Sequence, residues 1–165
     1  MKRTNLISIL FAVMLAIGGS VYADTSATTA ADAPYPAGTT FNGVSINGLD
    51  IGTGVLLGSD GVAEGHVAIA LFGPVNPLTN TAQTIIVEAA ITGGSHTAAN
   101  VVTLTGTGTV DMGNGSAPLV GVPVVVTLNT DANHQGTVGL TIGATTLPTV
   151  PVSDGSMSVV DLPTS

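Results

Sequence analysis

Residues 101–130 contain two long runs of strand-forming residues joined by a turn-forming connection, and this pattern limits the choice of fold. Threonine occupies every second position from 103 to 109 in the first run, and Val or Leu does so from 122 to 128 in the other. A period of two puts alternate side chains on opposite faces of a strand, and β-branched residues favour that conformation. Gly, Asn, Asp, Ser and Pro between the runs suit a chain reversal. The segment therefore predicts a β-hairpin with one buried aliphatic face and one threonine face.

Similar alternation, broken by turn residues, continues through the chain from residue 39 onward. It predicts about nine short strands, at 40–46, 49–57, 63–72, 84–91, 101–110, 122–130, 136–142, 145–150 and 157–161. Tight turns are expected at Asn47-Gly48, Asp60-Gly61, Gly143-Ala144 and Asp154-Gly155.

The prolines and the connection lengths bear on the architecture. Pro148 and Pro151 predict that the eighth strand lies at a sheet edge, because proline donates no backbone hydrogen bond. No segment shows a sustained helical period. We therefore expect an all-β fold, an antiparallel β-sandwich, because connections of varied length allow crossings between two sheets. A soluble up-and-down β-barrel is the alternative.

Residues 1–23 have the organisation of a secretory signal peptide. Lys2 and Arg3 precede an apolar run over 6–17, and the small residue Ala23 suits signal peptidase. The apolar run is shorter than the roughly 20 residues that cross a bilayer, which favours cleavage over a membrane anchor. We expect a mature chain that begins at Asp24, lies in the periplasm or outside the cell, and has no membrane span.

Cleavage there would leave the mature chain with no Lys or Arg. Both basic residues precede the cut and all ten acidic residues follow it, so the mature side chains would carry a formal charge of −10. Nucleic-acid binding, which depends on basic patches, is therefore not expected. Cysteine is absent as well, so stability has to come from burial and backbone pairing.

Residues 24–38 are rich in Ala, Thr and Pro and show no hydrophobic periodicity. Such a composition predicts a flexible segment. The expected organisation is thus a signal peptide over 1–23, a flexible segment over 24–38 and a single β domain over 39–165.

The sequence offers few groups for chemistry. His66, His96 and His134 are far apart and lack the spacing typical of zinc ligands. The nucleophile motif G-x-S-x-G is absent, and without Lys, Arg or Cys a mature enzyme would have a narrow choice of catalytic groups. We expect a protein that is not an enzyme, with no catalytic, cofactor-binding or metal-binding residues.

Two further patterns have simpler interpretations. Asn129, Asp131 and Asn133 alternate like the start of a calcium loop, but His134 stands where an EF-hand needs glycine. Side chains that cap their own turn are the preferred interpretation. The threonine row at 103–109 is similar in pattern to the ice-binding faces of some β-rich antifreeze proteins. It covers one strand, so an ordinary solvent-facing strand explains it better.

These observations predict an exported, non-catalytic β protein with a structural, adhesive or binding role at or beyond the cell envelope. Self-association through a sheet edge is one route, with 39–46 as the strand that a neighbour could accept. The alternative is a soluble β-barrel that carries a small apolar ligand. A large apolar pocket would favour the carrier, whereas a filled core with an unpaired strand edge would favour assembly.

Overall fold

The computed structural model describes residues 23–75 and 82–162, and every regular element in these ranges is a β-strand. The long strands are β1 (Ala23–Pro34), β4 (Gly48–Gly58), β5 (Val62–Phe72), β6 (Thr84–Ala98), β7 (Val101–Asp111), β8 (Leu119–Thr130), β9 (Gly136–Ile142) and β12 (Asp154–Asp161). The short ones are β2 (Thr40–Phe41), β3 (Val44–Ser45), β10 (Thr145–Thr146) and β11 (Val150–Pro151). The prediction of an all-β, antiparallel fold is confirmed.

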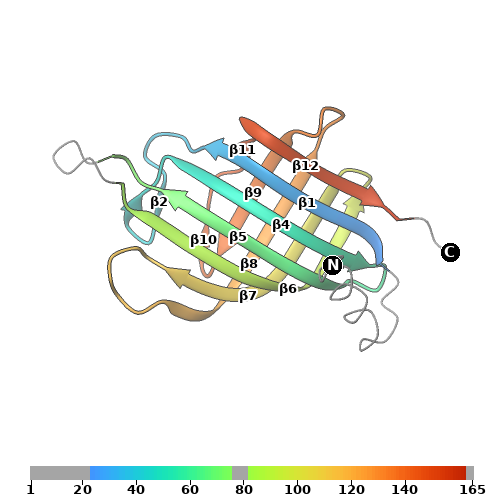
Figure 1. Ribbon diagram of the computed structural model, residues 1–165, viewed down its shortest axis with the longest axis horizontal. Helices are drawn as coiled ribbons and strands as arrows, with labels where there is room; N and C mark the ends of the chain where they lie inside the picture. The colour runs from blue at the N-terminus through green and yellow to red at the C-terminus, as the bar shows by residue number, and fades with distance from the viewer. Residues whose placement is uncertain (1–22, 76–81, 163–165) are drawn as a thin grey trace, which may run out of the picture.

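A 10-stranded sheet contains all of these strands except β2 and β3, in the order β10-β9-β8-β7-β6-β5-β4-β1-β12, with β11 also paired to β9. From β4 to β9, strands that are consecutive in sequence are neighbours in the sheet. The sheet curls, so that β1, β4 and β5 cross in front of β8 and β9 (Figure 1). One curled sheet thus combines the facing layers of a sandwich with the strand order of an up-and-down barrel.

The curl depends on close approach between β6 and β7. Gly106 and Gly108 take inward-facing positions on β7, and a Cβ at Gly106 would lie 2.0 Å from the carbonyl oxygen of Ala90. The β6–β7 register also shifts between Ile91 and Gly93. Bulges and glycines bend a sheet because they remove side chains and ladder pairing at the inner side of the bend. Here they turn β6 and β7 from the front layer into the back one.

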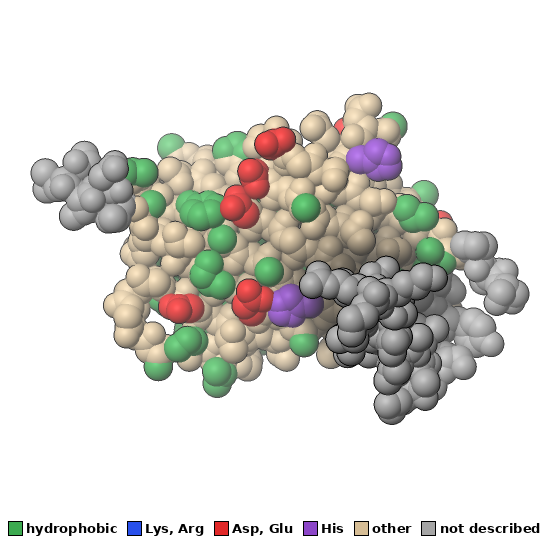
Figure 2. Space-filling model, viewed as in Figure 1, with side chains coloured by type: hydrophobic (Ala, Val, Ile, Leu, Met, Phe, Trp, Pro, Cys, Tyr) green, Lys and Arg blue, Asp and Glu red, His purple; other side chains and the backbone are tan. Residues whose placement is uncertain are grey.

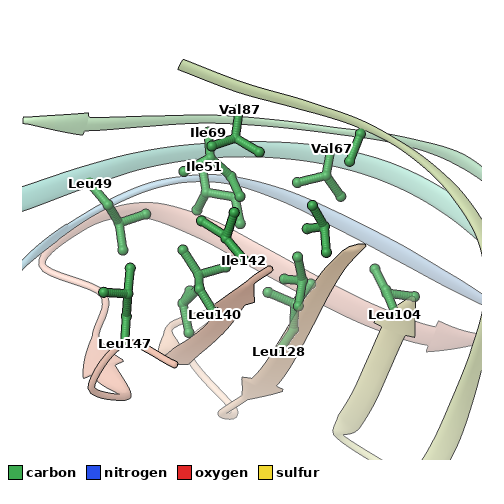
Figure 3. Packing of buried hydrophobic residues seen from close by; sticks show 14 of the residues in the cluster. Leu49, Ile51, Val67, Ile69, Val87, Leu104, Leu128, Leu140, Ile142 and Leu147 are labelled. Carbon is green, nitrogen blue, oxygen red and sulfur yellow. The ribbon is translucent and has the colours of Figure 1, made fainter. Parts of the chain in front are cut away.

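The core lies between the two layers and is mainly aliphatic. Side chains from both layers point toward one another, as Figure 3 shows for Ile69 and Val87 on one side and Leu128 and Leu140 on the other. The predicted hairpin is confirmed, because β7 pairs with β8 and Leu104 lies opposite Val126. Its aliphatic face is buried, as predicted, at Val102, Leu104, Val110, Val124, Val126 and Leu128.

The two ends of the sheet meet along one side of the molecule. At one end of the sheet, β10 and β11 both pair with the edge of β9 that faces away from β8, and the segment between them contains Pro148, which agrees with the predicted edge. Just after β11, the N–H of Val152 donates to the carbonyl of Gly136 in β9 at 2.9 Å. Within β12, the N–H of Met157 donates to the carbonyl of His134 at 2.7 Å. These bonds draw the curled sheet toward a closed barrel.

The prediction of a flexible segment over 24–38 is wrong for its first part. Residues 23–34 form β1, which pairs with β4 on one side and with β12 on the other. Its inward-facing side chains are small and buried, at Thr25, Ala27, Thr29, Ala31 and Ala33. Alternation of Ala and Thr gives almost no hydrophobic signal, yet such side chains fit where the facing layer is close. Sheet pairing and packing therefore order a segment that local composition does not.

Smaller differences concern turns and strand limits. The predicted strand 40–46 is a hairpin of β2 and β3 that turns at Asn42-Gly43, both with positive φ. Asp154-Gly155 forms the start of β12 rather than a turn. Asn47-Gly48 leads into β4, but β3 and β4 do not pair, so the two residues do not form a hairpin turn. The predicted strand 145–150 is divided into β10 and β11. The turns at Asp60-Gly61 and Gly143-Ala144 are confirmed.

The predicted signal peptide lies outside the described residues, apart from Ala23. Within the described ranges, there is no helix of the length and apolarity that crossing a membrane requires.

Candidate functional site

The three histidines lie on different elements and do not converge. His66 on β5 pairs with Glu88 on β6. His96, near the end of β6, has its Nδ1 atom 3.2 Å from Oδ1 of Asp161 on β12. His134 lies between β8 and β9 with φ of 60°. Among the residues that the structure describes, no cluster of three or more His, Asp or Glu side chains is arranged to hold a metal ion.

The segment that resembles the start of a calcium loop caps its own turn. Oδ1 of Asp131 accepts hydrogen bonds from the N–H of Asn133 at 2.8 Å and from the N–H of Gln135 at 2.9 Å. Asp111 caps Gly113 in the same way, at 2.9 Å. The turn interpretation is therefore confirmed for Asp131.

A shallow trough of about 270 Å³ lies on the outer face of the front layer. Gly52, Ala68 and Ala70 form its floor, because their short side chains leave the surface low between β4 and β5. Asp50, Ile86 and Glu88 also line it, and Ile86 is 39% exposed. We call this surface the small-residue trough. Figure 2 shows hydrophobic, acidic and histidine side chains on this face, and no Lys or Arg among the described residues.

A row of carboxylates runs alongside the trough. Asp32 on β1 lies directly opposite Asp154 on β12 and directly opposite Asp50 on β4. Burial raises the pKa of Asp50, and the hydrogen bond and the negative charge of Asp32 raise it further. Like charges on facing positions repel one another, so this row opposes the pairing of its own strands.

A second concave site, of about 450 Å³, lies at the end of the sheet where β1 begins. Its polar lining includes Thr25, Ser59, Asp60, Ser95 and His96. We call it the terminal pocket. The pocket joins residues from β1, the β4–β5 turn and β6, and no local motif predicts it, because the strands that build it meet only in the folded sheet.

The polar groups beside the terminal pocket form a short network. The Thr25 hydroxyl donates to Oδ1 of Asp161 at 3.3 Å, and the same hydroxyl lies 3.2 Å from Nδ1 of His96. Nε2 of His96 is buried and has no hydrogen-bond partner among the described residues. The network is therefore incomplete at this nitrogen.

No family model, curated protein or solved structure matches this chain. The threonine row of β7 does not continue as a row on β8. Only Thr103 faces another threonine, Thr127, whereas Val125, Pro123 and Val120 face the other three. The features that bear on function are the filled core, the outer surfaces and the terminal pocket.

Proposed function

We propose that this protein is an exported, non-catalytic β protein with a structural, adhesive or binding role at or beyond the cell envelope. The observation that carries the proposal is the filled interior. Leu104, Leu128, Leu140 and Ile69 occupy the space between the layers and are at most 2% exposed. A carrier of apolar ligands usually encloses a cavity of at least about 300 Å³. Here aliphatic side chains fill the corresponding region, and contacts with other molecules fall to the outer surface.

The small-residue trough supports a contact role for the front layer. Its floor of Gly and Ala lets a partner's backbone or side chains approach the sheet closely, and Ile86 offers apolar area. Asp50 and Glu88 at the sides would accept hydrogen bonds from the partner. The chemistry that fits is an apolar segment flanked by amide, hydroxyl or cationic donors.

The outer edge of β12 supports self-association as one form of this role. Among the described strands β12 pairs with β1 alone, and its opposite edge is joined at Met157 to the carbonyl of His134. The remainder of that edge, around Val159, has backbone groups that could pair with another chain. The hairpin of β2 and β3 does not suit the role of exchanged strand, because Phe41 is 1% exposed and Ile46 is 3% exposed.

Export is tested by expression of the full-length chain with its own N-terminus, followed by cell fractionation and intact-mass analysis. We expect protein in the periplasm or medium with Asp24 as its first residue. Cytoplasmic protein that retains Met1 or Lys2 would contradict the proposal.

The contact role is tested on the purified mature chain by light scattering and electron microscopy at several salt concentrations. Ten carboxylates per chain repel one another, and salt screens them, so association should strengthen as salt rises. Mass spectrometry of an organic extract of the same sample tests the alternative function, because a carrier would release a small apolar ligand into the extract. A compact monomer at every salt concentration, together with a stoichiometric apolar ligand, would favour the carrier over the proposal.

A further inference from the structure

The terminal pocket gathers hydrogen-bond acceptors at the place where β1 begins. Asp60 lines it from the β4–β5 turn and His96 from β6, and Asp161 of β12 contacts both Thr25 and His96. Asp60 uses Oδ1 to cap the N–H of Val62 at 3.0 Å, which leaves its other oxygen to accept a further bond. A group that donates several hydrogen bonds and carries positive charge would fit this site best.

The network assigns the proton of His96. Because the Thr25 hydroxyl donates its hydrogen to Asp161, it can accept one from Nδ1 of His96, 3.2 Å away. Nδ1 is also 3.2 Å from the Asp161 carboxylate, so both neighbours favour a proton on Nδ1. In the tautomer that carries its proton on Nδ1, Nε2 presents a lone pair. A buried acceptor without a donor is unfavourable, and Nε2 is such an acceptor within the described part of the chain.

We propose that the terminal pocket receives the chain's own α-amino group after cleavage before Asp24, and that Asp161, Asp60 and His96 hold it. The inference rests on the export proposed above. Cleavage would create an ammonium group one residue before Thr25, and Thr25 lies opposite Asp161 in the β1–β12 ladder. One residue spans about 3.8 Å, so the new N-terminus lies within reach of these groups.

The strand register leaves Asp24 available for this contact. The β1–β4 ladder pairs Ala23 with Gly58 and then Thr25 with Leu57, so Asp24 has no partner in that ladder. The described β1–β12 ladder ends at Thr25. The amine of Asp24 can therefore donate to side chains rather than to a neighbouring strand.

The contact matters because cleavage gives the Asp24 nitrogen a positive charge. The chain from Asp24 onward has no Lys or Arg, so the new ammonium group would be its one cationic group apart from the histidines, against ten side-chain carboxylates. An uncleaved peptide nitrogen has no charge. Removal of the signal peptide would thus create an ion pair that fastens the start of β1 between β4 and β12.

The proposal predicts a specific effect of blocking the amine. Residues 24–165 are released from a fusion by a protease that leaves Asp24 first, so that the test does not depend on cellular export. Acetylation with an amine-directed reagent then modifies the α-amine selectively, because lysine is absent from these residues. Acetylation should lower the folding equilibrium constant, measured by urea unfolding at pH 7, by about two- to fivefold, the range of partly exposed ion pairs.

Two variants separate a local contact from general electrostatics. In Asp161→Asn, acetylation should change the folding equilibrium much less than in the unaltered chain. Glu64→Gln removes one exposed charge from β5, outside the pocket, and should preserve the full effect. Equal effects of acetylation in both variants would overturn the proposal, because the amine would then act through total charge.

A second measurement covers the case in which Asp161→Asn does not fold. The α-amine pKa of the unaltered chain is measured from the pH dependence of its acetylation rate, folded and in urea. The nearby carboxylates of Asp60 and Asp161 would favour the charged amine and so raise that pKa in the folded chain. We expect the folded pKa above the unfolded one of about 8; an equal or lower value would overturn the proposal. If the native protein keeps its signal peptide, that result contradicts the proposed export but not the fit of the Asp24 amine to the pocket.

Discussion

The backbone N–H of Met157 donates a 2.7 Å hydrogen bond to the carbonyl of His134 and so joins β12 to the turn between β8 and β9. β12 ends one side of the sheet order, and β9 lies near the other end. The bond therefore holds together two parts of the curled sheet that no ladder connects. Its geometry depends on the turn, where Asp131 accepts from the N–H of Asn133 and of Gln135.

Asp131→Ala should loosen this closure. The variant loses two hydrogen bonds to a carboxylate, and we expect a destabilisation of about 1–3 kcal/mol. Amide exchange measured by NMR should accelerate at Met157 more than at Val87 in β6. Asp111→Ala serves as the control, because Asp111 caps the N–H of Gly113 in the connection between β7 and β8. Equal acceleration at Met157 in both variants would contradict the role given to the Asp131 turn.

Gly106→Ala should be strongly destabilising. Its Cβ would lie 2.0 Å from the carbonyl oxygen of Ala90, a backbone atom that cannot move without disturbing the β6–β7 ladder. Gly54→Ala is the matched control, because a Cβ there meets nothing within 4 Å. Urea unfolding should show a loss of about 2–4 kcal/mol for Gly106→Ala and little change for Gly54→Ala. Similar losses in both variants would mean that the bend does not depend on this close approach.

Leu128→Ala should leave a cavity between the layers. Leu128 is fully buried, whereas Leu56 on the outer face of β4 is 47% exposed. Truncation of a buried leucine costs about 2–5 kcal/mol, and Leu56→Ala should cost less than about 1 kcal/mol. Calorimetric melting of the two variants measures the difference. A small loss of stability in Leu128→Ala would indicate a loosely packed interior and would favour the alternative function, a carrier of an apolar ligand.

Asp50→Asn should stabilise the protein at neutral pH. The pKa of Asp50 is raised in the folded chain by burial and by Asp32, so the folded state binds its proton more tightly than the unfolded state does. Stability therefore falls as pH rises from the ordinary aspartate pKa through the raised one. Relief of a facing like-charge pair contributes about 0.2–1 kcal/mol.

The pH dependence of melting checks this assignment. The gain from Asp50→Asn should be present at pH 7 and disappear near pH 3, where Asp50 is protonated in both states. Glu64→Gln removes one negative charge, as Asp50→Asn does, but from an exposed position on β5. It should give a smaller gain in stability at pH 7. A gain from Asp50→Asn that persists at pH 3 would show that repulsion from Asp32 is not its cause.

Trypsin should leave the exported protein intact, even after denaturation. Trypsin cleaves after Lys or Arg, and the only ones are Lys2 and Arg3. Gel electrophoresis after digestion in urea checks this, with a lysine-containing protein as the positive control for protease activity. Tryptic fragments from denatured protein would show that the signal peptide had been removed at some other site or had not been removed at all.

Much of the sheet could be predicted from the sequence. The aliphatic alternation at Leu104, Val126 and Leu128 identified β7 and β8 and the face that each one buries. Gly106 and Gly108 gave no comparable information, because a glycine within a strand pattern is compatible with a bulge, a bend or a weak strand. Their role follows from the distance to β6, which depends on how the sheet curls.

The terminal pocket could not be predicted, because its groups come from distant parts of the chain. Thr25 falls in a segment whose composition suggests flexibility, and His96 and Asp161 have unremarkable sequence neighbours. Only the β1–β12 register brings Thr25 opposite Asp161, and the end of β6 then supplies the imidazole.

The sequence was enough to establish the strand pattern apart from β1, the aliphatic core and the lack of Lys and Arg after residue 3. These are local or compositional properties, and side-chain alternation is enough to establish them. The tertiary structure alone decided that β1 is a strand within the sheet, that one curled sheet supplies both layers, and that Met157 meets His134. The physical reason is that small side chains such as Ala27 and Ala31 are stabilised by the strands and layer around them, which the local sequence does not contain.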